Sequence, residues 1–401
     1  MSAMLEGIRI VDMTTVIFGP YATQMLADMG AEVIKVEAPG GDQLRQFGRS
    51  RVAPRQMGPV HCTLNRGKRA IALDLKEEQD RSTMARLIAS ADVFVHNVRG
   101  EAMERLGFGY DAARALRPDI LYVHCQGFGP GGPYEGLQAY DDVIQAATGT
   151  TTLLPRADGD PRPRYLPSLI ADKVAGLYGA QAILAAIVHR LRSGEGQFVE
   201  VPLFESFAHF MLQEHLFGAA FDPPLEPAGY PRQIDPNRQP FPTADGYVSI
   251  VPYTPATIER LFALMDAAHV LADPRFAAPM DRLRNISALY AEIAHITPTR
   301  TSAQWVALLN AGGVPCMPVR DLDEIRDDPH LRATGFFRPR VHPQEGSYVE
   351  MPLPIRFSAR GVPEGPPPPG IDQDGAAIRG ELGEGGGSIK HAWRGETVRE
   401  S

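Results

Sequence analysis

The stretch IRIVDMTTVIFGPYATQMLADMGAEVIKVE, residues 8–37, decides the fold of this 401-residue chain. It begins with the short apolar run IRIVDM, continues through YATQMLADMG, which Pro20 opens and Gly30 ends as a helix, and closes on the apolar run AEVIKVE. Two strands joined by a single helix this short form a parallel crossover unit, which is right-handed in nearly all proteins. The stretch therefore predicts an α/β fold built on a parallel sheet.

The same alternation of apolar runs and helical segments continues to about residue 203. Strands are expected at IALDL (71–75), VFVHN (93–97), ILYVHCQ (120–126) and FVEVPL (198–203), with helices over 77–90 and 168–192. Alternating strands and helices are typical of a Rossmann-like, doubly wound sheet. Such sheets bind ligands at the carboxyl ends of their strands.

The composition of the sequence changes at Phe221. There the proline-rich segment FDPPLEPAGYPRQIDPNRQPFP precedes the strand-like GYVSIVPY and a row of helical segments. This change predicts a second, smaller α+β domain. The expected organisation is a large α/β domain over 1–203, a linker over 204–235, the small domain over 236–320, and a return segment over 321–401 that completes the large domain and ends in a loose tail.

Composition and charge narrow the class of protein. Hydrophobic residues make up 44% and charged residues 22% of the chain, which is ordinary for a globular protein and excludes disorder as its dominant state. The net charge of -8, without a block of basic residues, makes nucleic acid an unsuitable partner. The three cysteines, Cys62, Cys125 and Cys316, lie far apart with no CxxC pair, so we expect a reducing compartment and no metal site.

The start of the chain carries no visible targeting signal. MSAMLEGIRIVDM lacks the basic residues and the apolar stretch of a signal peptide, and no run of 18 consecutive apolar residues occurs elsewhere. We therefore expect a cytoplasmic protein without a membrane partner.

A glycine-rich loop follows the strand ILYVHCQ. Gly127, Gly129 and Gly132 match GxGxxG, but Pro130 and Pro133 interrupt the helix that a dinucleotide site requires, and an acidic residue about twenty positions on is missing. The match is therefore interpreted as a tight loop at the carboxyl edge of the sheet rather than a nicotinamide site.

A carboxylate stands at the head of the long helix. If Ser168 is the N-cap, Asp172 lies in the first turn, where the helix dipole favours a charged carboxylate, and Gly176 and Gly179 leave little side-chain bulk beside it. Such a group can be a nucleophile, but acidic residues in first turns usually only complement the dipole. Tyr140, Asp141 and Asp142, after the glycine loop, are likewise interpreted as an N-cap cluster rather than a site.

Five segments in order together resemble the class III CoA-transferases, which include carnitine, bile-acid and formyl-CoA transferases. They span residues 5–206 and read LEGIRIVDMTTVIFGPYATQMLADMGAEVIKVEAP, LNRGKRAIALDLK, DVFVHNVRGEAMERLG, QGFGPGGPYEGLQAYDDVIQAATG and DKVAGLYGAQAILAAIVHRLRSGEGQFVEVPLFES. The resemblance implies CoA transfer between an acyl-CoA and a carboxylic acid, with CoA as a substrate rather than a tightly bound cofactor. It also implies an interlocked homodimer.

The resemblance assigns roles to particular residues. Asp172 falls where the family has its nucleophilic aspartate, which would carry an anhydride and then a CoA thioester, with amides of the glycine loop as oxyanion donors. Contacts to CoA are implied for Val16, Ile17, Phe18, Leu73, Lys76, Asn97, Arg105 and Tyr140. Simple core packing is the alternative role for Val16, Phe18 and Leu73.

The chain departs from the formyl-CoA branch of the family. Ala38 and Ile17 stand where that branch has a basic residue and a glutamine, and its run of consecutive glycines does not occur between Phe221 and Arg320. Oxalate and formyl-CoA are therefore not the expected substrates. Arg45, Arg49, Arg51, Arg162 and Arg164 suit a second carboxylate, so a dicarboxylate such as succinate is the expected acid, although loop arginines are commonly solvated surface.

Two other functions fit parts of the pattern. An α-methylacyl-CoA racemase or epimerase would resemble the N-terminal segments equally well, but it needs a second acid–base group, and Tyr140 stands where that branch has a histidine. A neutral tyrosine is a poor base near pH 7. The other alternative is a CoA-binding protein without catalytic activity, which an intact Asp172 disfavours.

Overall fold

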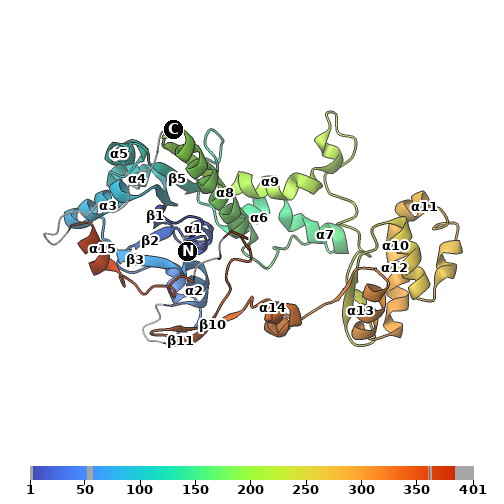
Figure 1. The fold of residues 1–401 in the computed structure, drawn as a ribbon. Coiled ribbons are helices and arrows are strands. Elements are labelled where there is room, and N and C mark those ends of the chain that lie inside the picture. Colours follow the sequence, from blue (N-terminus) through green and yellow to red (C-terminus); the bar gives the residue numbers. More distant parts are fainter. Residues whose placement is uncertain (1–2, 52–56, 360, 362–363, 384–401) are drawn as a thin grey trace, which may run out of the picture. The chain divides into compact units, whose positions relative to one another are not determined.

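The computed structural model describes residues 3–51, 57–359, 361 and 364–383 (Figure 1). The chain forms two compact units that are each built from separate segments. The large unit consists of Met1–Thr148, Leu166–Met211 and Leu331–Ser401, and the small unit of Gly149–Tyr165 and Leu212–His330.

A six-stranded sheet forms the centre of the large unit (Figure 1). Its strands are β1 Arg9–Met13, β2 Glu32–Glu37, β3 Lys68–Ala72, β4 Val93–His96, β5 Leu121–Gln126 and β6 Gln197–Pro202. They lie in the order β3-β2-β1-β4-β5-β6, and every neighbouring pair is parallel. The predicted parallel α/β sheet is confirmed, and its strand order reverses between β1 and β4, which is where sheets of this order bind ligands.

Helices pack on both faces of the sheet. Those of the large unit are α1 Phe18–Asp28, η1 Gln43–Gln46, α2 Pro59–Asn65, α3 Glu78–Ser90, α4 Gly100–Leu106, α5 Tyr110–Leu116, α6 Asp141–Ala147, α8 Ile170–Ser193 and α15 Gly375–Glu381. The boundaries between the units fall within α9 Leu203–His215 and α14 Pro329–Ala333. Apolar residues of α3, α4, α5 and α15 share one core with alternate residues of β1 to β5. Helices α1 and α8 pack against each other outside that core.

Helix α8 approaches α1 closely because of two glycines. A Cβ on Gly176 would stand 2.9 Å from the backbone oxygen of Phe18 and from Cδ1 of Tyr21, and one on Gly179 would stand 3.3 Å from Cβ of Ala22. By length and composition α8 is long and apolar enough to cross a membrane, and half of its apolar window is buried inside the protein.

The small unit has its own core around a three-stranded antiparallel sheet. Its elements are η2 Thr150–Thr152, α7 Leu153–Asp158, η3 Phe217–Ala220, β7 Phe241–Pro242, β8 Tyr247–Ile250, α10 Pro255–Leu264, η4 Ala268–Ala272, α11 Pro279–Arg284, α12 Ile286–Ile296, η5 Thr297–Thr299, α13 Ser302–Ala311, β9 Cys316–Pro318 and η6 Leu322–Asp327. Trp305, Phe262 and Phe276 are fully buried in this core. An α+β small unit is therefore present.

The boundaries differ from the predicted ones in two places. Residues Gly149–Tyr165 belong to the small unit, although they lie within the predicted large domain of 1–203. One contact that joins them to it is the hydrogen bond of 2.8 Å from Arg156 of α7 to the backbone oxygen of Ala228. The third strand is Lys68–Ala72 rather than 71–75. It begins with Lys68, which is buried in an ion pair, and a search for apolar runs does not include a charged residue in a strand.

The return segment completes the large unit, with a hairpin of β10 Arg338–His342 and β11 Gly346–Glu350 followed by α15. The carboxylates of Asp374 and Asp372 accept the backbone N–H groups of Ala70 and Ala72, so residues near the end of the chain cap the edge strand β3. The segment predicted as a loose tail is therefore ordered through this helix, and residues 384–401 lie outside the described residues.

Candidate active site

The turn between β1 and α1 leaves the sheet at the point where the strand order reverses. Thr15 donates its backbone N–H to Oδ1 of Asn97 at 3.0 Å, and Nδ2 of Asn97 donates to the backbone oxygen of Thr15 at 2.9 Å. Asn97 follows β4, so this pair of hydrogen bonds joins the carboxyl ends of β1 and β4. Two of the predicted CoA-binding regions, at Val16 and Asn97, are thereby brought together.

Val16 has an unfavourable backbone conformation. Its φ of 68° lies in the left-handed region, where a β-branched side chain is strained. The Val16 N–H points to the Asp42 carboxylate at 3.3 and 3.4 Å, and Asp42 forms a fully buried ion pair of 3.1 Å with Lys35, which also donates to the backbone oxygen of Thr14. Strain of this kind, held in place by surrounding contacts, is typical of functional turns.

A second buried ion pair lies beneath the turn. Nζ of Lys68 donates to Oδ2 of Asp12 at 3.0 Å, and also to Thr23 and Asn65. Burial alone would raise the pKa of Asp12, but the charges of Lys68 and Lys35 bring it down to about 2. The same burial lowers the pKa of Lys68 to about 8, against the opposing attraction of Asp12. The pair fixes the end of β1 to β3.

The remaining predicted CoA residues differ in accessibility. Ile17, Phe18 and Leu73 are buried, Ile17 with Leu44 and Leu64, and Leu73 in the core beneath α3. Lys76, after β3, and Arg105, in the last turn of α4, are exposed. Tyr140 stands at the N-cap of α6 with 61% of its surface exposed. The structure thus buries Ile17, Phe18 and Leu73 and leaves the other three accessible.

Asp172 lies in the first turn of α8, as predicted, and only 9% of its surface is exposed. The helix begins one residue later than expected, because its N-cap is Leu169 rather than Ser168. The hydroxyl of Ser168 instead accepts a hydrogen bond of 2.7 Å from Nζ of Lys173.

Asp141, the first residue of α6, contacts the backbone of Asp172. Its Oδ1 accepts the Asp172 N–H at 3.1 Å, and its Oδ2 accepts Nε2 of Gln145 at 2.6 Å. Burial, and then the negative charge of Asp141, raise the pKa of Asp172 to about 7. Sequence reasoning treated Asp141 only as part of an N-cap cluster and missed Gln145. The signal that could have found them is two polar residues four apart on one side of a short helix, ahead of a candidate nucleophile.

The glycine loop does not present all of its amides to a ligand. The Gly129 N–H donates to both carboxylate oxygens of Glu205, at 3.0 and 3.1 Å, and the Gly131 N–H donates to Glu135 at 2.9 Å. The expectation that this loop supplies oxyanion donors is therefore corrected for these two amides, which already hold carboxylates.

The arginines expected near the substrate also have different surroundings. Arg45 is buried and pairs with Glu37, so it serves the fold. Arg51 donates to the backbone oxygen of Glu345, and Arg164 pairs with Asp158 in the small unit. Arg49 and Arg162 are exposed.

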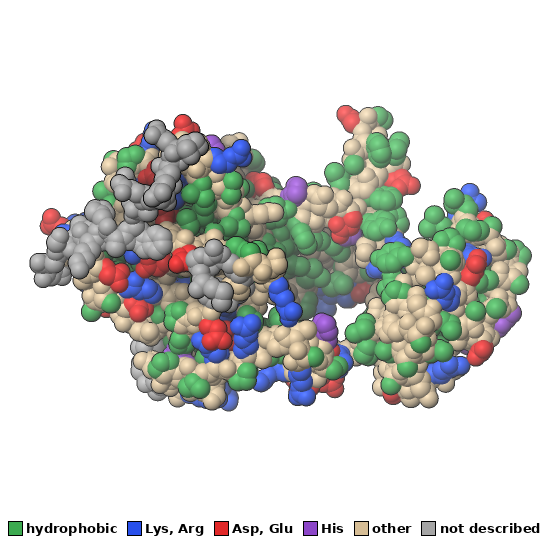
Figure 2. Space-filling model, in the orientation of Figure 1, with side chains coloured by type: hydrophobic (Ala, Val, Ile, Leu, Met, Phe, Trp, Pro, Cys, Tyr) green, Lys and Arg blue, Asp and Glu red, His purple; other side chains and the backbone are tan. Residues whose placement is uncertain are grey.

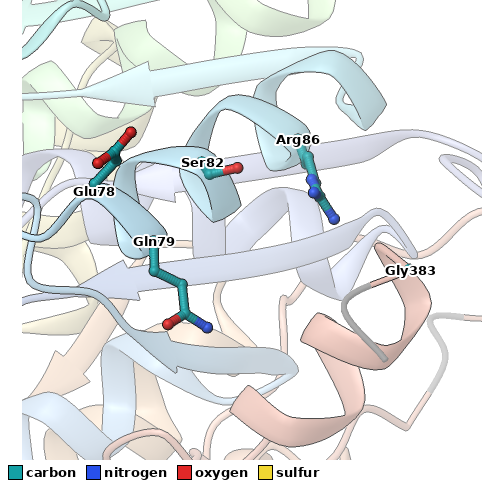
Figure 3. Close-up of a pocket in the computed structure, with 5 residues that line it drawn as sticks. All are labelled: Glu78, Gln79, Ser82, Arg86 and Gly383. Atoms are coloured by element: carbon teal, nitrogen blue, oxygen red, sulfur yellow. The ribbon is translucent and has the colours of Figure 1, made fainter. Parts of the chain in front are cut away.

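A shallow hollow of about 590 Å³ lies elsewhere on the large unit, between α3 and the end of α15 (Figure 3). It is lined by Glu78, Gln79, Ser82, Arg86 and Gly383. Four of these residues belong to α3, and Gly383 follows the end of α15. Among the described residues, no three His, Cys, Asp or Glu side chains gather as a metal site.

Comparison with known proteins assigns the family. The family model described as "CoA-transferase family III" matches residues 5–375. The chain is 34% identical to a probable fatty acyl-CoA transferase of Mycobacterium tuberculosis, over 91% of this chain and 94% of that protein. It is 32% identical to the succinyl-CoA:mesaconate CoA-transferase of Haloarcula hispanica, over 96% and 98%.

A solved structure agrees with the sequence comparison. The crystal structure of a CAIB/BAIF family protein from Brucella suis superimposes with a TM-score of 0.82 at 30% identity, over 95% of this chain and 100% of that one. Together with the buried aspartate at the head of α8 and the turn at the strand-order reversal, these matches show that the chain belongs to CoA-transferase family III and is a class III CoA-transferase.

Proposed function

We propose that this enzyme moves CoA from an acyl-CoA donor to a carboxylic acid through covalent intermediates on Asp172. The observation that carries the proposal is a carboxyl group that is buried in the first turn of α8 and has a pKa of about 7. A carboxylate of this basicity is a stronger nucleophile than an ordinary aspartate, and its shielding from water protects an intermediate from hydrolysis.

The first half of the reaction charges the enzyme. The Asp172 carboxylate attacks the thioester carbonyl of the donor, the carbon–sulfur bond breaks, and CoA leaves as its thiolate, which gives a mixed anhydride. The thiolate then attacks the aspartyl carbonyl of that anhydride. This step forms an aspartyl-CoA thioester and releases the donor acid as a carboxylate.

The second half repeats these steps with the acceptor acid. Its carboxylate attacks the aspartyl thioester and expels the CoA thiolate, which gives a second anhydride. The thiolate attacks the acceptor's carbonyl, so that the new acyl-CoA forms and Asp172 is returned as a carboxylate. No water is consumed, and no proton is gained or lost over the cycle.

CoA is proposed to bind along the turn after β1. Val16 and Asn97 lie together there, and the exposed cations Lys76 and Arg105 suit the phosphates of the nucleotide. The proposed acid is a dicarboxylate such as succinate, in keeping with the succinyl-CoA and mesaconate named for the relative from Haloarcula hispanica.

We also propose an interlocked cytoplasmic homodimer. The chain leaves the large unit after Met211 and returns to it at Leu331, which is the order that two linked subunits require. Hydrophobic side chains gather over α8 (Figure 2), and Leu177, Val188 and Leu191 of that helix are exposed, so a partner subunit has apolar surface to cover.

The test is to trap the aspartyl thioester. The enzyme is incubated with succinyl-CoA and hydroxylamine, digested, and analysed by mass spectrometry; a hydroxamate at Asp172 and at no other residue is expected. Asp172→Ala should abolish transfer while Asp142→Ala, an exposed matched control, keeps it. Modification at another carboxylate, or turnover by Asp172→Ala within tenfold of the parent, would show that Asp172 is not the nucleophile.

A further inference from the structure

Helix α8 lacks an N-cap of its own. A capping side chain normally accepts the N–H of the second or third helical residue, and Leu169, at the N-cap position, has no atom that can do so. The third residue is Asp172, and its N–H is accepted by Asp141 from α6. The carboxylate that caps α8 therefore comes from another helix, and it caps the amide of the proposed nucleophile itself.

Gln145 extends this contact to the turn before the helix. Its Nε2 donates to Asp141 and reaches the backbone oxygens of Leu166 at 3.3 Å and Ser168 at 3.1 Å, while its Oε1 accepts the Leu166 N–H at 2.9 Å. Asp141 is 3% exposed and Gln145 is 0% exposed. Both polar atoms of the Gln145 side chain thus bond to the segment ahead of α8, at Leu166 and Ser168.

We propose that Asp141 and Gln145 are positioning residues for Asp172, which hold its backbone and the preceding turn so that the nucleophilic carboxyl is presented in one orientation. The negative charge of Asp141 has a second effect, because it keeps the Asp172 carboxyl basic. This inference rests on the proposed role of Asp172. Asp141 acts on Asp172 through its charge and its hydrogen bond, and Gln145 acts only by holding Asp141 and the preceding turn in place.

The groups around Asp172 allow the charge effect to be isolated. From α6, Asp141 faces it and Asp142 is exposed. On α8 itself, the ammonium of Lys173 bonds to Ser168, and α1 contributes the phenol-bearing Tyr21 beside Gly176. After burial, Asp141 is the charge that raises the pKa of Asp172.

The decisive variant is Asp141→Asn, which keeps an oxygen to accept the Asp172 N–H and removes the charge, but also replaces the oxygen that accepts Nε2 of Gln145 with an amide nitrogen. Gln145→Met loses the same hydrogen bond and keeps the charge, so it separates the two effects. The acid limb of kcat/KM should shift to lower pH by about one unit, as expected for loss of a close like charge. Asp142→Asn removes the same charge from the next, exposed residue and should leave the profile unchanged. Circular dichroism and thermal unfolding first establish that each variant is folded.

Gln145→Met tests the geometric role. We expect kcat to fall about 10- to 100-fold, the size of the effect of a small displacement of a reacting group, with KM for acyl-CoA within about twofold and the acid limb in its original place. If Asp141→Asn does not fold, this split between kcat and KM decides the proposal.

Three results would overturn the inference: an Asp141→Asn profile that matches Asp142→Asn, an unchanged kcat in Gln145→Met, or loss of folding in both variants, which would show that the pair serves the fold alone. Hydroxylamine trapping on the parent enzyme separates this from failure of the proposed function. If Asp172 is modified there, only the positioning role is wrong.

Discussion

Replacing the proposed nucleophile should make the protein more stable above neutral pH. The Asp172 carboxyl has a pKa of about 7 in the folded protein against 3.8 in an unfolded chain, because burial and Asp141 disfavour its charge. Each pKa unit corresponds to about 1.4 kcal/mol, so ionised Asp172 costs about 4 kcal/mol of folding free energy at pH 8. Asp172→Asn has nearly the same shape and no charge, and it should recover most of this amount.

The pH dependence gives this prediction its sign. A group whose pKa is raised on folding stabilises the folded state fully below its unfolded pKa, and that stability is lost as pH rises through the folded pKa. The advantage of Asp172→Asn should therefore be near zero at pH 4, grow between pH 4 and 7, and level off above pH 7.

The assay is urea unfolding of the parent and the variant across this pH range. Asp142→Asn, an exposed neighbour, serves as control and should change stability by less than about 0.5 kcal/mol. A variant that is no more stable than the parent at pH 8, or an advantage that does not grow with pH, would refute the raised pKa and with it the basic nucleophile.

Three further predictions use the same groups. The value of kcat/KM should fall about tenfold per pH unit below pH 7, because Asp172 becomes protonated. A value of kcat/KM that stays constant down to pH 5 would contradict this. Burial and the charge of Arg45 lower the pKa of His61 to about 2, and burial and His124 lower the pKa of His96 to about 3. Each of these two histidines should therefore reduce the free energy of unfolding by about 1.4 kcal/mol per pH unit below 6.5. In thermal unfolding measured over a pH series, His96→Gln should lose less stability on the acid side than the parent. Because Tyr140 stands where a racemase would need a base, a 2-methylacyl-CoA should not exchange its α-proton in deuterated water, and exchange as fast as transfer would favour the racemase.

The fold was predictable because the sequence pattern is local. Short apolar runs separated by helical segments determine a parallel α/β sheet, and β1, β2, β4, β5 and α8 lie within one or two residues of their predicted places. The bounds of β3 were not predictable in this way, since Lys68 can be buried only because Asp12, Thr23 and Asn65 bond to its ammonium group. That information lies in contacts between residues far apart in the sequence.

The candidate site was predictable only in part, for the same reason. Asp172 could be found from its place in a helix and from the family resemblance, whereas Asp141 and Gln145 acquire their role when α6 packs beside the start of α8. The separation of 31 residues between Asp141 and Asp172 in the chain does not show that the two will be in contact. Likewise, the strained Val16 and its partner Asp42 are 26 residues apart, and only the structure brings them together.

Two fully buried ion pairs lie around the turn after β1, to which the proposed function assigns CoA binding. Asp12, Lys35, Asp42 and Lys68 are buried around one turn, where replacing ion pairs by apolar residues would usually cost nothing or add stability. Their hydrogen bonds instead hold Val16 in a conformation that a valine disfavours. Asp172 is likewise buried at a cost in free energy, with Asp141 increasing that cost. The sheet core beneath α3 contains apolar residues, and its free energy can offset both costs, so a rigid turn and a basic carboxylate are maintained in a stable protein.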